Sequence, residues 1–343
     1  MSIVIAIIIF SIIILFHELG HFLLAKANGI RVNEFSLGLG PTLVGFTKGE
    51  TKYSIKLLPF GGACMMEGED NESEDSRAFN NKSVLGRISV VAAGPIFNFI
   101  MAFTFAVVVV AILGFGKCEV GSVKPGYSAA EAGIQEGDEI IRLGNKRIHL
   151  FKELAFYTYV HQDEDIDVTL LRDGKEKTVT LKPTYDKKEK RYVIGITGAG
   201  YEKGNALQVL KYGFYDVKYY IDTTLTSLKL LITGGVSLND LSGPVGIVST
   251  IGDAYNDAKP GGALLVFLNL SVMVILLSAN LGVMNLLPIP ALDGGRLVFL
   301  IVEAIRGKKM NPDKEGMIHF VGLLILLALM VVVMFNDFRK FFV

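Results

Sequence analysis

Four stretches of this chain are too long and too apolar to be buried inside an ordinary soluble fold. They run from Ile3 to Leu24, Ile88 to Phe115, Leu264 to Leu287 and Met317 to Phe335. Each is close to or above the length of about 20 residues that a helix needs to cross the hydrocarbon core of a bilayer. The mean hydropathy of +0.45 over 343 residues agrees, because soluble enzymes of this size are less apolar. The sequence therefore predicts an α-helical membrane protein with about four transmembrane helices, in contact with a lipid bilayer.

Polar segments with distinct compositions separate the spans. Residues 51–62 alternate apolar and polar side chains, which predicts a β-hairpin with one face on an apolar surface. Asp173-Gly174 between alternating runs predicts another hairpin inside a small soluble domain. Residues 206–231 are helical in pattern, with tyrosines among charged residues, which favours an interfacial or packed surface helix over a fifth span. The predicted segments are 1–25 (first transmembrane helix), 26–87 (hairpin region and loop), 88–115 (second transmembrane helix), 118–184 (soluble domain), 185–262 (interfacial helices and loop), 264–296 (third transmembrane helix and the segment after it) and 317–336 (fourth transmembrane helix).

The distribution of lysine and arginine predicts the orientation of the chain. Short cytoplasmic loops are enriched in these residues, which are frequent after the first span and before the fourth. We therefore expect the hairpin on the cytoplasmic side, and both termini and the soluble domain on the extracytoplasmic side. Cys64 and Cys118 then lie on opposite sides, so no disulfide is expected between them. Lysine plus arginine and aspartate plus glutamate both total 34 without a basic run, so nucleic acid is not a predicted partner.

Ionisable residues interrupt the first span in the sequence HELGH, where His17, Glu18 and His21 form the pattern H-E-x-x-H. Residues four apart on a helix lie on one face, so both imidazoles can bind one metal ion while Glu18 stands beside them as a general base. Average composition puts a chance match below about one per cent for a chain of this length, and ionisable groups within a span are usually functional. The motif therefore predicts a zinc site inside the membrane.

Two histidines do not complete a catalytic zinc site, which usually has three protein ligands and a water. His149 and His161 belong to the soluble domain, and His319 begins the fourth span without a partner motif. A carboxylate is therefore the better candidate. Asp293, in the sequence NLLPIPALDGGR at the cytoplasmic end of the third span, is the predicted third ligand, because the prolines before it leave unwound backbone near the inner face.

Together these motifs resemble those of the site-2 proteases, which are intramembrane zinc metalloproteases, and specifically the bacterial branch with a single PDZ domain. HELGH matches the family pattern H-E-x-x-H, and Asn285 to Gly294 match N-x-x-P-x-P-x-L-D-G without a gap. Further matches are FSLGLGP, LLPFGG, AAGPIFN and SGPVGI, and GYSAAEAGIQEGDEIIRLGNKRI resembles the core of a protease-associated PDZ domain. The chain departs from the family at Ala63 to Met66, where ACMM stands in place of a common tyrosine, valine, lysine and methionine.

The resemblance implies one zinc ion per chain and hydrolysis of peptide bonds in or near transmembrane segments of other membrane proteins. Zinc held by His17, His21 and Asp293 would lower the pKa of its water, with Glu18 as the catalytic base. The implied substrates are single-span proteins already cut on the outer side by another protease, such as an anti-sigma factor or a signal-peptide remnant. The implied fold has an extracytoplasmic PDZ-like α+β domain at 118–184 and an active site near the cytoplasmic face of the bacterial cytoplasmic membrane.

A helical substrate must expose its backbone before it can be cut, so polar groups near the metal are candidate substrate-positioning residues. They are Asn280, Asn285, Pro288 and Pro290 in and after the third span, and Asn98 in the second. The alternative for the asparagines is inter-helix hydrogen bonding within the bundle. The hairpin is predicted to pair with an unwound substrate segment by strand addition, to cover the water path to zinc, or both.

Two other classes of function agree with parts of the sequence. A membrane-anchored PDZ scaffold with a non-catalytic metal site is disfavoured, because all the ligand types and the base are present. A metal transporter is disfavoured, because such proteins more often show repeated spans and several polar groups at the midplane, and neither is found here. The sequence does not predict the oligomeric state.

Overall fold

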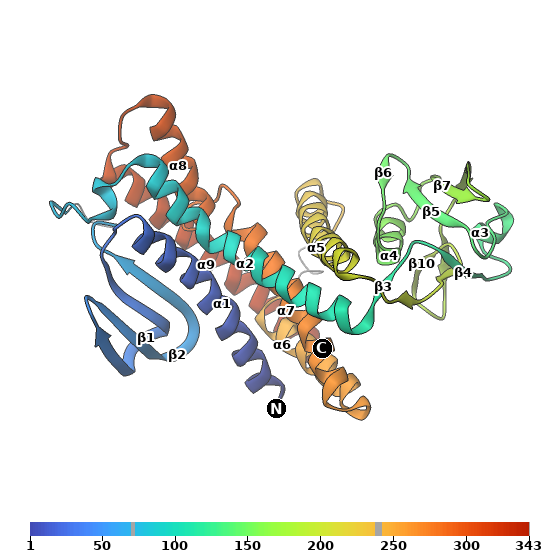
Figure 1. The fold of residues 1–343 in the computed structure, drawn as a ribbon, viewed down its shortest axis with the longest axis horizontal. Coiled ribbons are helices and arrows are strands. Elements are labelled where there is room, and N and C mark those ends of the chain that lie inside the picture. Colours follow the sequence, from blue (N-terminus) through green and yellow to red (C-terminus); the bar gives the residue numbers. More distant parts are fainter. Residues whose placement is uncertain (70–72, 237–241, 343) are drawn as a thin grey trace. The chain divides into compact units, whose positions relative to one another are not determined.

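The computed structural model describes residues 1–69, 73–236 and 242–342 (Figure 1). The chain forms two compact units, one made of residues 1–105 with 220–343 and the other of residues 106–219. Each unit has its own hydrophobic core. Residues 70–72 of the predicted hairpin region and residues 237–241 of the predicted interfacial segment lie outside the described residues.

Four of the described helices are long and apolar enough to cross a membrane. They are α1 (Ser2–Ala27), α2 (Val84–Leu113), α7 (Ala263–Asn285) and α9 (Pro312–Phe342). α1 ends where Gly29 adopts φ +65° and Asn28 Nδ2 donates a hydrogen bond to Leu24 O at 2.8 Å. The prediction of about four transmembrane helices is confirmed in length and composition.

The predicted hairpin is present as two long antiparallel strands, β1 (Val32–Lys48) and β2 (Thr51–Met66). Both strands bend, so that Phe35 pairs with Tyr53 on one side and with Cys64 on the other. The hairpin therefore curls into a sheet in which the start of β1 lies between two parts of β2. Its side of the membrane stays a prediction.

Glycines allow this curl. Gly38 has φ +88°, and a Cβ there would lie 2.5 Å from Leu58 O, so only glycine fits. Gly61 has φ +81° immediately before the last part of β2. The strand segment Gly62–Met66 thus runs back along the start of β1 as an edge of the sheet, where it packs against α1.

A hydrophobic core fixes α1 and the hairpin against α2 and a further helix, α8 (Asp293–Arg306). Its buried members are Ala25, Ile30, Val32, Cys64, Met66, Phe79, Val90, Val91 and Leu300. The prolines after the third span predict unwound backbone, and the structure has non-helical backbone between α7 and α8. A regular helix begins again at Asp293. This core therefore sets the distance between α1 and the start of α8.

Among the described residues, the other helices of this unit are α6 (Pro244–Ala258), the second half of α5 (Ala206–Thr233), and the 3-10 turns η1 (Phe79–Asn81) and η3 (Lys259–Gly261). A second core joins α6 to α1, α2 and α7 through Ala6, Ile9, Ile13, Met101, Ile251 and Val274. Asp337 of α9 caps α6, because its carboxylate accepts hydrogen bonds from Gly243 N–H at 2.9 Å and Gly246 N–H at 3.0 Å. The SGPVGI motif is thus a helix start that α9 stabilises.

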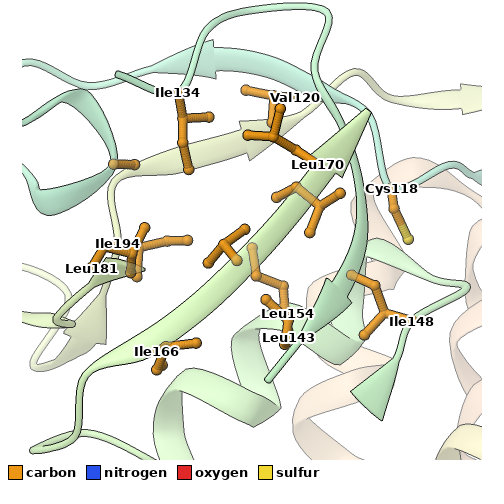
Figure 2. Close-up of a cluster of buried hydrophobic side chains, with 13 residues drawn as sticks. Cys118, Val120, Ile134, Leu143, Ile148, Leu154, Ile166, Leu170, Leu181 and Ile194 are labelled. Carbon is orange, nitrogen blue, oxygen red and sulfur yellow. The ribbon is translucent and has the colours of Figure 1, made fainter. Parts of the chain in front are cut away.

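Residues 106–219 form a small α+β domain (Figure 1). Its elements after α2 are β3 (Phe115–Gly116), β4 (Val120–Val123), α3 (Ser128–Glu131), β5 (Glu139–Leu143), β6 (Lys146–Arg147), α4 (Phe151–Val160), β7 (Ile166–Arg172), β8 (Lys175–Leu181), β9 (Thr184–Asp186), β10 (Arg191–Val193), β11 (Ile196–Gly198) and β12 (Tyr201–Glu202), followed by the first half of α5. A four-stranded antiparallel sheet has the order β6-β5-β7-β8, and the predicted turn at Asp173-Gly174 joins β7 to β8 with both residues at positive φ. Figure 2 shows the core of this domain, in which Val120, Leu143 and Leu170 are fully buried.

This domain extends past the boundary at residue 184 that the sequence predicts. β11 pairs with β4, and β12 pairs with β3. These strands have only two to four residues each, which is too short for alternation to reveal them.

Candidate metal centre

His17 and His21 lie one turn apart on α1, and both are 8% exposed. Their Nε2 atoms are 3.2 Å apart, and their rings meet edge to face with centroids 4.8 Å apart. Gly94 of α2 makes room for them, since a Cβ there would lie 2.3 Å from His21 Nε2. The glycine of the AAGPIFN motif is therefore a part of the centre that the sequence analysis missed.

Hydrogen bonds to the other ring nitrogens orient both imidazoles. His21 Nδ1 lies 2.9 Å from Val90 O, so this nitrogen carries the hydrogen and donates it, which leaves the Nε2 lone pair for a metal ion. His17 Nδ1 lies 3.1 Å from the amide of Asn98, which is 0% exposed. Metal binding through Nε2 requires a hydrogen on Nδ1, which needs an acceptor. If the oxygen and nitrogen of the Asn98 amide exchange places by a 180° rotation, Oδ1, which otherwise has no hydrogen-bond partner, accepts this hydrogen.

Asp293 at the start of α8 completes the cluster. Its Oδ2 lies 3.1 Å from His17 Nε2 and 3.6 Å from His21 Nε2. The glycines after it are required by packing, because a Cβ at Gly294 would lie 2.1 Å from Leu287 O. In the LDGG sequence, Asp293 is the candidate ligand, and the two glycines after it let the preceding loop pack closely against α8.

The loop between α7 and α8 contains Pro288 and Pro290 and is held from α9. His319 Nδ1 accepts a hydrogen bond from Ala291 N–H at 2.9 Å. Ala291 has φ +76°, a left-handed conformation that costs a residue with a side chain about 1 kcal/mol. His319 thus positions the loop that leads to Asp293, although no motif around this histidine suggests such a role.

The three donor atoms fit a zinc ion. They lie within 4.8 Å of one another. Ligands about 2.0–2.1 Å from a tetrahedral zinc are about 3.3 Å apart, close to the 3.1, 3.2 and 3.6 Å found here. Asp293 Oδ2 is buried and has no hydrogen-bond partner among the described residues, so a cation would satisfy it. Two imidazoles and one carboxylate leave the fourth position for water or substrate.

The cluster borders a cavity of about 290 Å³, called here the metal cavity. Its walls include Glu18 of α1, residues 63–66 of β2, and Asp293 of α8. Glu18 packs against the strand, because a Cβ at Gly62 would lie 2.8 Å from Glu18 Cγ, and both Glu18 and Cys64 line the cavity. Glu18 is thus held beside the three donor atoms without being one of them.

The predicted asparagines fall into two groups. Asn285 Nδ2 lies 3.4 Å from His17 Nε2 at the end of α7, and Asn98 contacts the same histidine from α2. Asn280 is not brought to the cluster, since its Oδ1 accepts a hydrogen bond from Thr224 of α5. This contact is the inter-helix bonding that the sequence analysis keeps as the alternative for this residue.

The fold and the site together define a class of protein. A helix able to span a membrane carries H-E-x-x-H, and a carboxylate from the segment after the third such helix completes a candidate set of nitrogen and oxygen ligands. A glutamate stands beside this set at the wall of a cavity. These are the features of a membrane-embedded zinc metalloprotease.

The chain belongs to peptidase family M50, whose model matches residues 5–329. It is 42% identical over 336 residues to a protein of Clostridium acetobutylicum that is named "putative zinc metalloprotease", covering 98% of this chain and 97% of that protein. It is 34% identical over 421 aligned residues to the regulator of sigma-W protease RasP of Bacillus subtilis, covering 98% of each. A PDZ domain of an SdrC-like protein of Listeria monocytogenes is 24% identical, with a TM-score of 0.22, covering 25% of this chain and 90% of that chain. The predicted family, enzyme class and zinc cofactor are confirmed.

Proposed function

We propose that this zinc metalloprotease cuts peptide bonds in or near the transmembrane segments of other membrane proteins. The observation that carries the proposal is the place of the donor cluster. His17 and His21 lie within the apolar span Ser2–Ala27, and Asp293 reaches them from just beyond α7. Ionisable groups within a membrane span are costly, so those that occur there usually serve a function. A zinc centre at this place would act on polypeptide within or beside the bilayer.

His17, His21 and Asp293 would hold the zinc ion, which as a Lewis acid supplies an activated water and a polarised scissile carbonyl. Val90 O and Asn98 keep the two imidazoles turned with Nε2 toward the ion. The protein thus fixes the direction of both ring nitrogens before substrate arrives.

Glu18 accepts a proton from the attacking water and later delivers it to the leaving amine. Its placement supports this role, because Glu18 packs closely against Gly62 and lines the metal cavity. The carboxylate therefore needs no large rearrangement to meet a water bound beside the histidines.

The strand segment Gly62–Met66 is the surface along which an unwound substrate segment would lie. One of its sides pairs with β1, and its residues line the metal cavity. A backbone so placed can pair with an extended peptide by strand addition and can also cover the path of water to zinc. Asn285, at the end of α7, offers a side-chain amide at the same centre.

We place the hairpin and the metal centre on the cytoplasmic side of the bacterial cytoplasmic membrane, and both termini and residues 106–219 on the outer side. The distribution of lysine and arginine supports this orientation. The proposed substrates are single-span proteins already shortened on the outer side, with the PDZ-like domain as a filter or docking element. Similarity to the regulator of sigma-W protease supports a membrane-bound anti-sigma factor as one such substrate.

Replacement of Glu18 by glutamine tests the mechanism. Purified Glu18→Gln protein should keep its zinc but cut a transmembrane peptide about 10²–10⁴-fold more slowly, the usual contribution of general acid–base catalysis. Membrane proteomics should show transmembrane fragments accumulating in cells that carry this variant. Glu50→Gln is the matched control, because Glu50 pairs with Lys26 at the hairpin turn and does not line the metal cavity. Cleavage by Glu18→Gln protein at the parental rate would refute the proposal.

A further inference from the structure

A second cavity of about 300 Å³ lies beside the metal cavity and has no part in the mechanism proposed so far. It is called here the polar cavity, because charged side chains from three helices line it. Among them are Arg87 of α2, Glu303 of α8 and Glu315 of α9. Walls of this kind bind water and do not suit lipid chains.

Glu69 and Arg296 line both cavities. Arg296 Nη1 donates to Glu69 Oε1 in an ion pair. Glu69 follows β2, and its Oε2 accepts a hydrogen bond of 3.3 Å from Met66 N–H at the end of the edge strand. Arg296 lies on α8 three residues after Asp293, on the same side of the helix. The ion pair therefore ties the edge strand to the helix that carries a candidate metal ligand.

A different ion pair holds the other end of α8. Arg87 donates to Glu303 through Nη1 at 3.1 Å and through Nη2 at 2.5 Å, and these side chains are 8% and 11% exposed. The side chains of Glu69 and Arg296 are 17% and 25% exposed. A more exposed ion pair separates more easily, because water replaces the lost hydrogen bonds. α8 is thus held firmly at Glu303 and is more easily released at Arg296.

We propose that Glu69 and Arg296 are positioning residues whose ion pair sets the width of the metal cavity and acts as a gate between it and the polar cavity. A substrate segment paired with Gly62–Met66 must fit between that strand and Asp293, and the ion pair links these two walls. When the pair separates, the walls move apart and the two cavities join. The catalytic meaning of this gate rests on the proposed function, whereas its opening does not depend on cleavage.

Cys64 provides a readout of the opening that does not depend on proteolysis. It lines the metal cavity, is 8% exposed and has a free thiol. The sequence has two cysteines, so full-length Cys118→Ala protein in detergent carries a single thiol. The rate at which a small charged methanethiosulfonate reagent modifies Cys64 then reports how often the cavity opens, because a buried thiol is inert until it is exposed.

We expect Glu69→Gln and Arg296→Gln each to raise this rate about two- to fivefold, the factor that matches the loss of one partly exposed ion pair. The double variant with Glu69→Arg and Arg296→Glu should return the rate toward the parental value, which a merely structural role of either residue would not produce. Glu50→Gln, which removes the ion pairs with Lys26 and Arg77 outside both cavities, is the control and should leave the rate unchanged.

Equal rates in the parent and in both single variants would overturn the proposal, as would an equal rise in Glu50→Gln protein. A rise that comes with loss of bound zinc would also count against it, because the whole centre would then have come apart. Since the measurement uses no substrate, a protein that gates normally but cuts no peptide would contradict the proposed function and leave the gate supported.

Discussion

Two carboxylates in this chain, one buried and one partly buried, have different partners. Asp138 of the α+β domain at residues 106–219 is 1% exposed, and Arg172 donates to both of its oxygens at 2.7 Å. Asp293 instead faces the Nε2 atoms of His17 and His21, and its buried Oδ2 has no hydrogen-bond partner among the described residues. A carboxylate met by protein donors stabilises a fold, whereas one that converges with other ligand atoms needs a cation. The groups that surround each carboxylate therefore distinguish a structural role, for Asp138, from a candidate metal-binding role, for Asp293.

The largest effect is expected from removing the charge that meets the histidines. Asp293→Asn protein should lose stoichiometric zinc, and cleavage should fall to background, because an amide is a much weaker zinc ligand than a carboxylate. Metal analysis of the purified protein and a peptide cleavage assay measure both. Asp138→Asn is the control and should keep its zinc. Full zinc content with normal cleavage in Asp293→Asn protein would remove Asp293 from the ligand set.

A somewhat smaller effect is expected from filling the space beside the ligands. Gly94→Ala places a Cβ 2.3 Å from His21 Nε2, so the ring must move away from the ion. We expect zinc affinity to fall about 100-fold, the upper end of what changes around the ligands cost. Gly316→Ala is the matched helical control, because a Cβ there meets nothing within 4 Å. Competition with a zinc chelator measures both variants, and equal affinities would contradict the packing argument.

The hydrogen bond that orients His17 should contribute less. Asn98→Ala is expected to weaken zinc binding about tenfold, while Asn98→Asp, which keeps an acceptor for the Nδ1 hydrogen, should restore much of the loss. Asn280→Ala is the control, since its partner is Thr224. The same zinc competition applies, and an equal loss in Asn280→Ala protein would show that the asparagines act only through helix packing.

The last prediction concerns Asp138 in the α+β domain, away from the metal centre. The hydrogen bonds from Arg172 hold the pKa of Asp138 below its usual range. Their stabilisation is therefore present above the unfolded-state pKa of about 4 and is lost as pH falls through the lower folded-state pKa. Arg172→Met should destabilise the domain by about 2–3 kcal/mol at neutral pH, because the hydrogen bonds that it removes go to a charged, buried carboxylate, with a smaller difference from the parent in acid. Hydrogen exchange of residues 106–219 measures this, and a difference independent of pH would contradict it.

The spans and the local part of the metal centre were determined by the sequence itself. An apolar stretch that crosses a bilayer must be helical, because its backbone polar groups have no other partners there. The helix period then puts His17 and His21 on one face whatever else surrounds them. The prolines before Asp293 likewise interrupt the helix without help from distant residues. These features depend on neighbours in the sequence, so they could be predicted one segment at a time.

Only the tertiary structure decided which residues meet across the chain. Asn280 and Asn285 look alike in the sequence, but five residues on a helix differ by about 140° around its axis. One therefore faces α5 and the other His17. No sequence pattern indicates that Gly94 makes room for the imidazole of His21. No pattern indicates that His319 hydrogen-bonds to the loop before Asp293 either.

The double pairing of β1 with β2 and the ion pair between Glu69 and Arg296 are also contacts that only the tertiary structure decided. The two residues of that pair are 227 positions apart, so no local pattern joins them. Periodicity fixes which face of an element is apolar or polar, whereas the partner of that face depends on how the elements pack. For this protein the candidate metal ligands could be predicted from local sequence patterns, whereas the residues that orient and enclose them depend on how the helices and strands pack.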